Sequence, residues 1–447
     1  MVGIHLHKFG DGRTRTVVRN VIESFLLRFV SIAVSFLIVP ITMDYVSPEL
    51  YGVWLTLSSV ILWLGFLDIG FTQGLKNKLT EAIALGDWER GRSLVSTTYF
   101  MMLAIFIPVC VLLQIVIPHI NWSSILNCNP VFEEDIRSSM QILVVFMSIQ
   151  MVVNVLVSVV AAFQKVALST SFTVIGQVLS FVVILVIRKL CPPSLVTLCF
   201  SISAMPILVL IIASLILYSK RFKAVRPSYG MIRKELIGDL FGLGVKFFII
   251  NIQVIILYQS TNFLISYVSS PLEVTEYNVA YKYLNLAMMA FTIIMTPLWP
   301  AFTDAYVKKE IAWMVKTRKR MYMLLAISLV ICFLMVLVSK PIYHIWIQDQ
   351  TEVSMKMTLT VAVYVLFYCW MNLNGTLLLG MGKILVETIL VVAGMLIHIP
   401  LSLFLSRYCG AYGVIYSMTA ITFVYALVFN VQVDKLLSGK ATGLWIR

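Results

Sequence analysis

Long apolar runs recur along the whole chain and are separated by short polar connections. A helix needs about 20 apolar residues to cross a hydrocarbon core of about 30 Å. Runs of that length lie near residues 20–43, 50–73, 93–118, 138–163, 169–187, 193–218, 238–268, 277–303, 321–339, 357–380, 384–405 and 410–433. The pattern therefore predicts an all-α membrane protein with twelve transmembrane helices.

The basic residues are shared unequally between the two sides of this arrangement. With the N-terminus in the cytoplasm, the connections on that side hold 25 of the 34 lysines and arginines, and the opposite connections hold six. Basic residues in short loops are retained on the cytoplasmic side, so we expect both termini there. The formal net charge of +13 then follows from topology and from attraction to anionic lipids, and it does not indicate a nucleic-acid partner.

The chain divides into two halves of six predicted helices. The basic segment 220–236 follows helix six, so we expect helical bundles at 1–219 and 237–447 joined by a cytoplasmic linker. The segment YVSPELYGVWLTL at 45–57 corresponds to YVSSPLEVTEYNVAYKYL at 267–284, although chance likeness of two apolar hairpins is the alternative. Because six crossings return the chain to the same side, the halves predict a parallel pseudo-repeat with a central cavity and a substrate site between them.

Polar residues recur on single faces of four predicted helices. A polar side chain in lipid is costly, so such faces are expected to point to the protein interior. Helical spacing relates the residues of helix one (Asn20, Ser24, Arg28, Ser31, Ser35), helix seven (Lys246, Gln253, Ser260) and helix eight (Lys282, Asn285, Thr292, Thr296). Helix two adds Thr56 and Ser59. We expect these four helices to line a polar cavity.

The charges on these faces predict an anionic cargo. Arg28, Lys246 and Lys282 lie on them, and Glu23 is the one acid close by in the sequence. A cationic cavity attracts anions, so the predicted substrate-binding residues are Arg28, Lys246, Lys282, Asn20, Ser31, Gln253 and Asn285. The alternative is that the basic residues neutralise buried acids or extend to lipid headgroups.

Two acids near the predicted cavity are candidates for ion coupling or for ion pairs. Asp68 lies nine residues beyond Ser59 and therefore on the opposite face of helix two. We expect it to pack against its own hairpin or to pair with Lys76 or Lys78. Glu23 follows Arg19 by four residues, a spacing that favours an ion pair on a helix.

Residues 51–100 resemble the corresponding part of bacterial polysaccharide repeat-unit flippases. The resemblance rests on Asp-x-Gly at 68–70, the run GLKNK at 74–78 and the tail VSTTY at 95–99. These proteins are Wzx-type O-antigen transporters of the multidrug/oligosaccharidyl-lipid/polysaccharide exporter superfamily. The sequence differs from the family at Lys76, where arginine is expected, and at Phe71-Thr72-Gln73, where the family is richer in glycine.

The resemblance implies two six-helix bundles around a cavity in a bacterial inner membrane. It also implies translocation of an undecaprenyl-pyrophosphate-linked oligosaccharide, such as an O-antigen repeat unit for lipopolysaccharide biosynthesis, from the cytoplasmic to the periplasmic leaflet. Membrane lipids, a polysaccharide polymerase and chain-length proteins would then be partners.

Two other functions stay open. A multidrug/cation antiporter of the same superfamily needs a more acidic cavity. A membrane polysaccharide polymerase usually needs a large outer loop with catalytic groups, whereas the loops near 119–137 and 340–356 are short. Seven cysteines without a Cys-x-x-Cys pair predict no metal site. Without a nucleotide-binding loop we expect no ATP hydrolysis, and we expect no cofactor and no enzyme activity.

Overall fold

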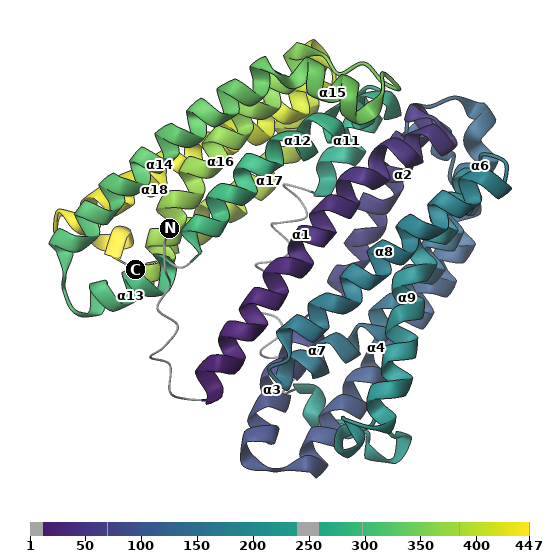
Figure 1. The fold of residues 1–447 in the computed structure, drawn as a ribbon, viewed down its shortest axis with the longest axis horizontal. Coiled ribbons are helices and arrows are strands. Elements are labelled where there is room, and N and C mark those ends of the chain that lie inside the picture. The colour runs from purple at the N-terminus through teal and green to yellow at the C-terminus, as the bar shows by residue number, and fades with distance from the viewer. Residues whose placement is uncertain (1–11, 69, 239–258, 297, 384, 447) are drawn as a thin grey trace. The chain divides into compact units, whose positions relative to one another are not determined.

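The computed structural model describes residues 12–68, 70–238, 259–296, 298–383 and 385–446. Nearly all of these residues lie in helices, and nine of the described helices are long and apolar enough to cross a membrane. The predicted all-α membrane fold is therefore confirmed. The chain forms two compact units, and most of the second is coloured from teal to yellow in Figure 1.

The first unit comprises Met1–Val46, Ile61–Ser123 and Asn129–Ile252. Its helices are α1 (Gly12–Val46), α3 (Phe71–Leu85), α4 (Trp88–Val116), α6 (Glu133–Val153), α7 (Val155–Ala162), α8 (Val166–Leu190) and α9 (Leu195–Ser219). Helix α8 packs between α1 and α9, and α6 packs against α4 and α9. The apolar face of α3, including Leu75 and Leu79, is fully buried in the core formed with α4 and α7.

The second unit comprises Ser47–Val60, Ser124–Cys128 and Gln253–Arg447. It contains most of α2 (Pro48–Leu62), part of the short helix α5 (Trp122–Ile125), and α11 (Ser260–Val268), α12 (Pro271–Met295), α13 (Leu298–Val307), α14 (Ile311–Leu337), α15 (Ser339–Ile347), α16 (Met355–Met381), α17 (Leu385–Cys409) and α18 (Ala411–Leu437). Helix α16 is central, because it packs against α12, α13, α14 and α18. Figure 1 shows α14, α16 and α18 running along one another.

Several predicted spans are interrupted in the structure. The span expected at 50–73 consists of α2, a 3₁₀ turn at Trp63–Asp68 and the start of α3, where Gly70 has a φ of 78°. Glycine adopts this left-handed conformation without steric cost. The span at 138–163 is divided between α6 and α7 at Asn154, and the span at 277–303 is divided between α12 and α13.

Short polar side chains define other helix boundaries. The Asp87 carboxylate accepts a hydrogen bond from the Arg90 backbone N–H at 2.9 Å and caps α4. Ser354 caps α16 in the same way through the Met357 N–H, at 3.0 Å. Such caps satisfy backbone donors that have no partner inside the helix, so these two residues determine where the helices start.

Residues 47–60 contact α11 and α12 through buried and half-buried polar groups. Thr275 Oγ1 donates to the Pro48 carbonyl at 2.6 Å. Asn262 Nδ2 donates to Ser59 Oγ at 2.8 Å, and Asn278 Nδ2 donates to Asn262 Oδ1 at 2.8 Å. These bonds explain why this part of α2 belongs to the second unit rather than to the N-terminal half of the sequence.

Candidate functional site

Several of the predicted site residues fall outside the described structure. Lys246 and Gln253 lie in the segment 239–258, which is not among the described residues. Asn20 and Glu23 belong to α1, but the described part of the structure does not include their side chains. The roles predicted for these four residues remain predictions.

The first unit contains Arg28 and Ser31. The Arg28 side chain is exposed, and Ser31 Oγ donates a hydrogen bond of 2.6 Å to Gln177 Oε1 on α8. The polar face of α1 is thus used at Ser31 for packing between two helices. Arg28 is placed so that its charge is accessible.

The second unit contains Lys282 and Asn285, both half-buried on α12. Asn285 Oδ1 is buried and has no hydrogen-bond partner among the described residues. Thr292 and Thr296 bond to carbonyls of their own helix. The structure therefore brings Lys282 and Asn285 onto one helix face, as their spacing predicts.

Asp68 acts as a local cap. Its carboxylate accepts hydrogen bonds from the backbone N–H of Thr72, at 3.0 Å, and from the Thr72 hydroxyl. Lys78, one of its two predicted partners, pairs instead with Glu81 at 3.3 Å. The hydrogen bonds of Asp68 thus lie within its own hairpin and stabilise the first turn of α3.

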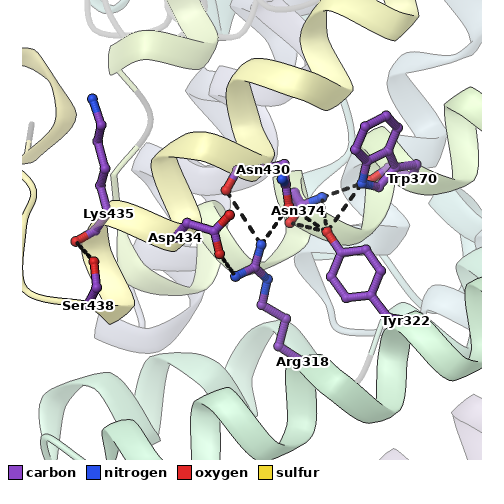
Figure 2. Close-up of polar contacts among 8 residues, drawn as sticks. All are labelled: Arg318, Tyr322, Trp370, Asn374, Asn430, Asp434, Lys435 and Ser438. Carbon is purple, nitrogen blue, oxygen red and sulfur yellow. Dashed lines mark hydrogen bonds and ion pairs between the residues drawn. The ribbon is translucent and has the colours of Figure 1, made fainter.

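A second polar cluster, which we call the Arg318 cluster, lies among α14, α16 and α18 (Figure 2). It consists of Arg318, Tyr322, Trp370, Asn374, Asn430 and Asp434. Each helix contributes two residues separated by four positions, so each pair lies on one helix face. The packing of α16 against α14 and α18 brings the three faces together.

The Arg318 guanidinium is the centre of this cluster. It pairs with the Asp434 carboxylate and donates to Asn430 Oδ1 at 2.6 Å. The guanidinium carbon also lies 5.4 Å from the centre of the Tyr322 ring, a cation–π distance. Figure 2 shows Lys435, the residue after Asp434, pointing away from Arg318.

The Tyr322 hydroxyl joins the remaining residues. It donates to Asn430 Oδ1 at 2.6 Å and accepts from Trp370 Nε1 at 3.2 Å and from Asn374 Nδ2 at 3.3 Å. Asn374 is fully buried. A network in which most of the polar groups are hydrogen-bonded is held rigidly, so Tyr322 and Asn430 hold Arg318 in a fixed place.

A pocket of about 620 Å³ opens beside this cluster. Its lining residues are Val315, Arg318, Lys319, Tyr322, Trp370, Asn430, Asp434, Leu437 and Ser438. The site offers guanidinium and ammonium donors, one carboxylate, an amide and two aromatic rings, which is the mixture of polar and apolar groups typical of small-ligand pockets.

Sequence reasoning does not find the Arg318 cluster, because the apolar run is expected to begin near residue 321 and Arg318 then lies in the basic connection before it. The structure starts α14 at Ile311 instead of near 321, which places Arg318 inside the helix. The sequence did contain one indication of the cluster. Arg318 and Tyr322, and likewise Asn430 and Asp434, are four positions apart and therefore share a helix face.

Residues 17–306 match the family described as polysaccharide biosynthesis protein, and residues 247–404 match the family described as MatE. No curated protein matches the chain significantly.

Solved structures share the fold at low sequence identity. An inward-facing multidrug resistance MATE family transporter of the MOP superfamily has a TM-score of 0.71 and 13% identity, with 92% of this chain and 95% of that chain covered. An outward-facing structure of such a transporter has a TM-score of 0.64 and 14% identity, with 96% of both chains covered.

A MOP superfamily transporter from Pyrococcus furiosus, described as having a binding pocket of reverse polarity, has a TM-score of 0.64 and 13% identity, again with 96% of both chains covered. The family match extends over more than half of the chain and agrees with the resemblance seen at residues 51–100. The chain therefore belongs to the polysaccharide biosynthesis protein family and has the fold of the MOP superfamily of transporters.

Proposed function

We propose that the protein is a flippase that moves a lipid-linked oligosaccharide across a bacterial cytoplasmic membrane. The substrate would be an undecaprenyl-pyrophosphate-linked repeat unit of an O-antigen or related polysaccharide, delivered to the periplasmic leaflet. The observation that carries this proposal is the match of residues 17–306 to the polysaccharide biosynthesis protein family. In this proposal both termini are cytoplasmic, and a polymerase and chain-length proteins act on the product.

The predicted basic residues of the cavity give a physical reason for an anionic substrate. The pyrophosphate headgroup is anionic, and the predicted cavity residues Arg28, Lys246 and Lys282 are cationic. An inside-negative membrane potential favours outward movement of an anion by about 2.3 kcal/mol per charge per 100 mV. A headgroup with about two charges could therefore be driven by the potential alone, while the prenyl tail stays in the lipid.

A multidrug transporter is the second candidate function. The MatE match at 247–404 and the fold of the MATE structures favour it. A cavity for cationic drugs needs acidic residues, whereas the charged residues predicted for this cavity are mainly basic. We therefore rank this function below the flippase.

Gene deletion and complementation test the two functions. We expect deletion to abolish surface polysaccharide and to leave lipid-linked repeat units on the cytoplasmic face. Wild-type protein should restore the polymer, and the double variant Arg28→Ala, Lys246→Ala should not, at equal membrane levels. Normal polymer in the deletion strain together with increased drug sensitivity would instead support the multidrug transporter.

A further inference from the structure

The Arg318–Asp434 ion pair is unequally exposed. The Arg318 side chain is 11% exposed, whereas the Asp434 side chain is 59% exposed. A buried charge needs a partner, because the loss of hydration is costly. An exposed carboxylate is hydrated and gains much less from the same pair. Asp434 is therefore the exchangeable member of the pair.

Arg318 has enough neutral support to keep its place without Asp434. Asn430 accepts from it, and Tyr322 lies beneath the guanidinium. Tyr322 is itself fixed by Trp370 and Asn374. In addition, Arg318 Nε is buried and has no hydrogen-bond partner among the described residues. The guanidinium is thus a preformed binding group with donor capacity to spare.

The adjoining pocket is suited to an anion. Asp434 is the one acid among its lining residues in the described structure, and Lys319 adds a second positive charge. Arginine binds phosphate and carboxylate groups through paired N–H donors. The Trp370 and Tyr322 rings supply apolar surface next to that charge.

We infer that this pocket binds the anionic group of a saccharide, a phosphate or a carboxylate, which replaces Asp434 on Arg318. The site lies wholly within the second unit, and none of the predicted cavity residues is among its lining residues. The inference rests on the proposed function for its saccharide class, because that function supplies glycans with such groups. Asp434 would act as a competitor that occupies the guanidinium when no glycan is bound.

Binding to the purified full chain tests this exchange. Calorimetric titration would compare N-acetylglucosamine 1-phosphate, glucuronate and neutral N-acetylglucosamine. Because Asp434→Asn removes the competing charge and keeps the side-chain shape, we expect it to tighten binding of an anionic sugar about tenfold. Arg318→Lys should abolish this binding, since an ammonium cannot reproduce the guanidinium geometry. The binding of neutral N-acetylglucosamine should be the same for both variants and the wild type.

Asp304→Asn is the matched control. Asp304 pairs with Lys308 at 2.7 Å in the same unit, and its side chain is 63% exposed. The control removes the same charge from a similarly exposed acid and should leave binding unchanged. Tighter binding of the phosphate or of the glucuronate supports the site and identifies the anion. Unchanged or weaker binding by Asp434→Asn overturns the inference, and thermal unfolding of each variant confirms that it is folded.

The binding result is independent of the complementation result. If deletion leaves surface polysaccharide intact but Asp434→Asn tightens sugar-phosphate binding, the proposed function fails and the binding site stands. If complementation supports the flippase and binding does not respond to Asp434→Asn, the site fails and the function stands.

Discussion

Gly52 allows an unusually close approach between α2 and α12. A Cβ atom at this position would lie 1.8 Å from the Pro271 carbonyl oxygen and 2.8 Å from Thr275 Oγ1. A carbonyl oxygen at the first turn of a helix cannot move away without displacing the backbone. We therefore expect Gly52→Ala to destabilise the protein by about 1–3 kcal/mol through overpacking, measured as a lower thermal unfolding temperature in detergent.

Gly230→Ala is the control for this substitution. A Cβ atom at Gly230 would meet no atom within 4 Å, so the expected change in stability is within about 0.5 kcal/mol. Equal unfolding temperatures for the two variants would show that α2 does not approach α12 as closely as the structure indicates.

Single residues were predictable where spacing alone determines their position. Ser31 lies on a face that was expected to line a cavity, and in the structure it bonds to Gln177 on a neighbouring helix, while Lys282 and Asn285 share a face of α12. The partners of these residues were not predictable, because Gln177 is separated from Ser31 by 146 positions. Arg318 was misread for a related reason: its partners Asn430 and Asp434 lie on α18, more than a hundred positions away in the sequence.

At the scale of the element, variants of Asp68 distinguish a structural role from a role in transport for an acid near a membrane span. Its carboxylate accepts from the Thr72 N–H and hydroxyl and so holds the start of α3. We expect Asp68→Ala to cost about 0.5–2 kcal/mol, the usual effect of removing a cap. Asp68→Asn should cost less, because the amide oxygen still accepts from the Thr72 N–H.

Complementation with the same variants separates the two roles. If Asp68 is a cap, Asp68→Asn should restore surface polysaccharide to the wild-type level at equal membrane abundance. Loss of polymer with Asp68→Asn, in a protein as stable as the wild type, would show that the negative charge itself is needed, as expected for ion coupling.

Element boundaries were predictable where a local signal exists. Asp87 and Ser354 mark the starts of α4 and α16 by capping them. Hydropathy could not reveal the break at Asn154, because the residues on both sides of it remain apolar. The break at Gly70 lies between the polar residues Asp68 and Thr72, which a hydropathy average over a whole span does not resolve. The start of α14 was misplaced because four basic residues between 316 and 320 lie in its second and third turns, and helix formation does not require the first turns to lie in lipid.

At the scale of the whole molecule, the division into halves was only partly visible in the sequence. Residues 47–60 and 124–128 pack with the second unit, although both precede the linker expected at 220–236. The hydrogen bonds of Thr275 to Pro48 and of Asn262 to Ser59 explain why residues 47–60 belong to the second unit. A hydropathy profile contains no information about such long-range pairing. A division of the chain at its longest loop therefore does not show that these two segments pack with the second unit.

The topology of the whole chain is predicted by its basic residues and has consequences for the Arg318 pocket. Basic connections remain on the cytoplasmic side, so α14, whose first ten residues belong to the basic segment 304–320, should start there. Its second turn carries Arg318, and Asn430 and Asp434 lie in the last two turns of α18, close to the C-terminus. The pocket should therefore open toward the cytoplasm, where prenyl-linked glycans are built.

Reporter fusions measure this arrangement directly. Alkaline phosphatase is active only outside the cytoplasm, so fusions within 119–137 and 340–356 should be active and fusions within 220–236 or at the C-terminus should be inactive. Green fluorescent protein fused at the same four places should give the reverse pattern and serves as the control for expression. Active phosphatase at the C-terminus would place Asp434 on the outer side. An anion bound at Arg318 would then be a translocated glycan and not an incoming substrate, so the fusion pattern determines the stage of transport at which the pocket acts.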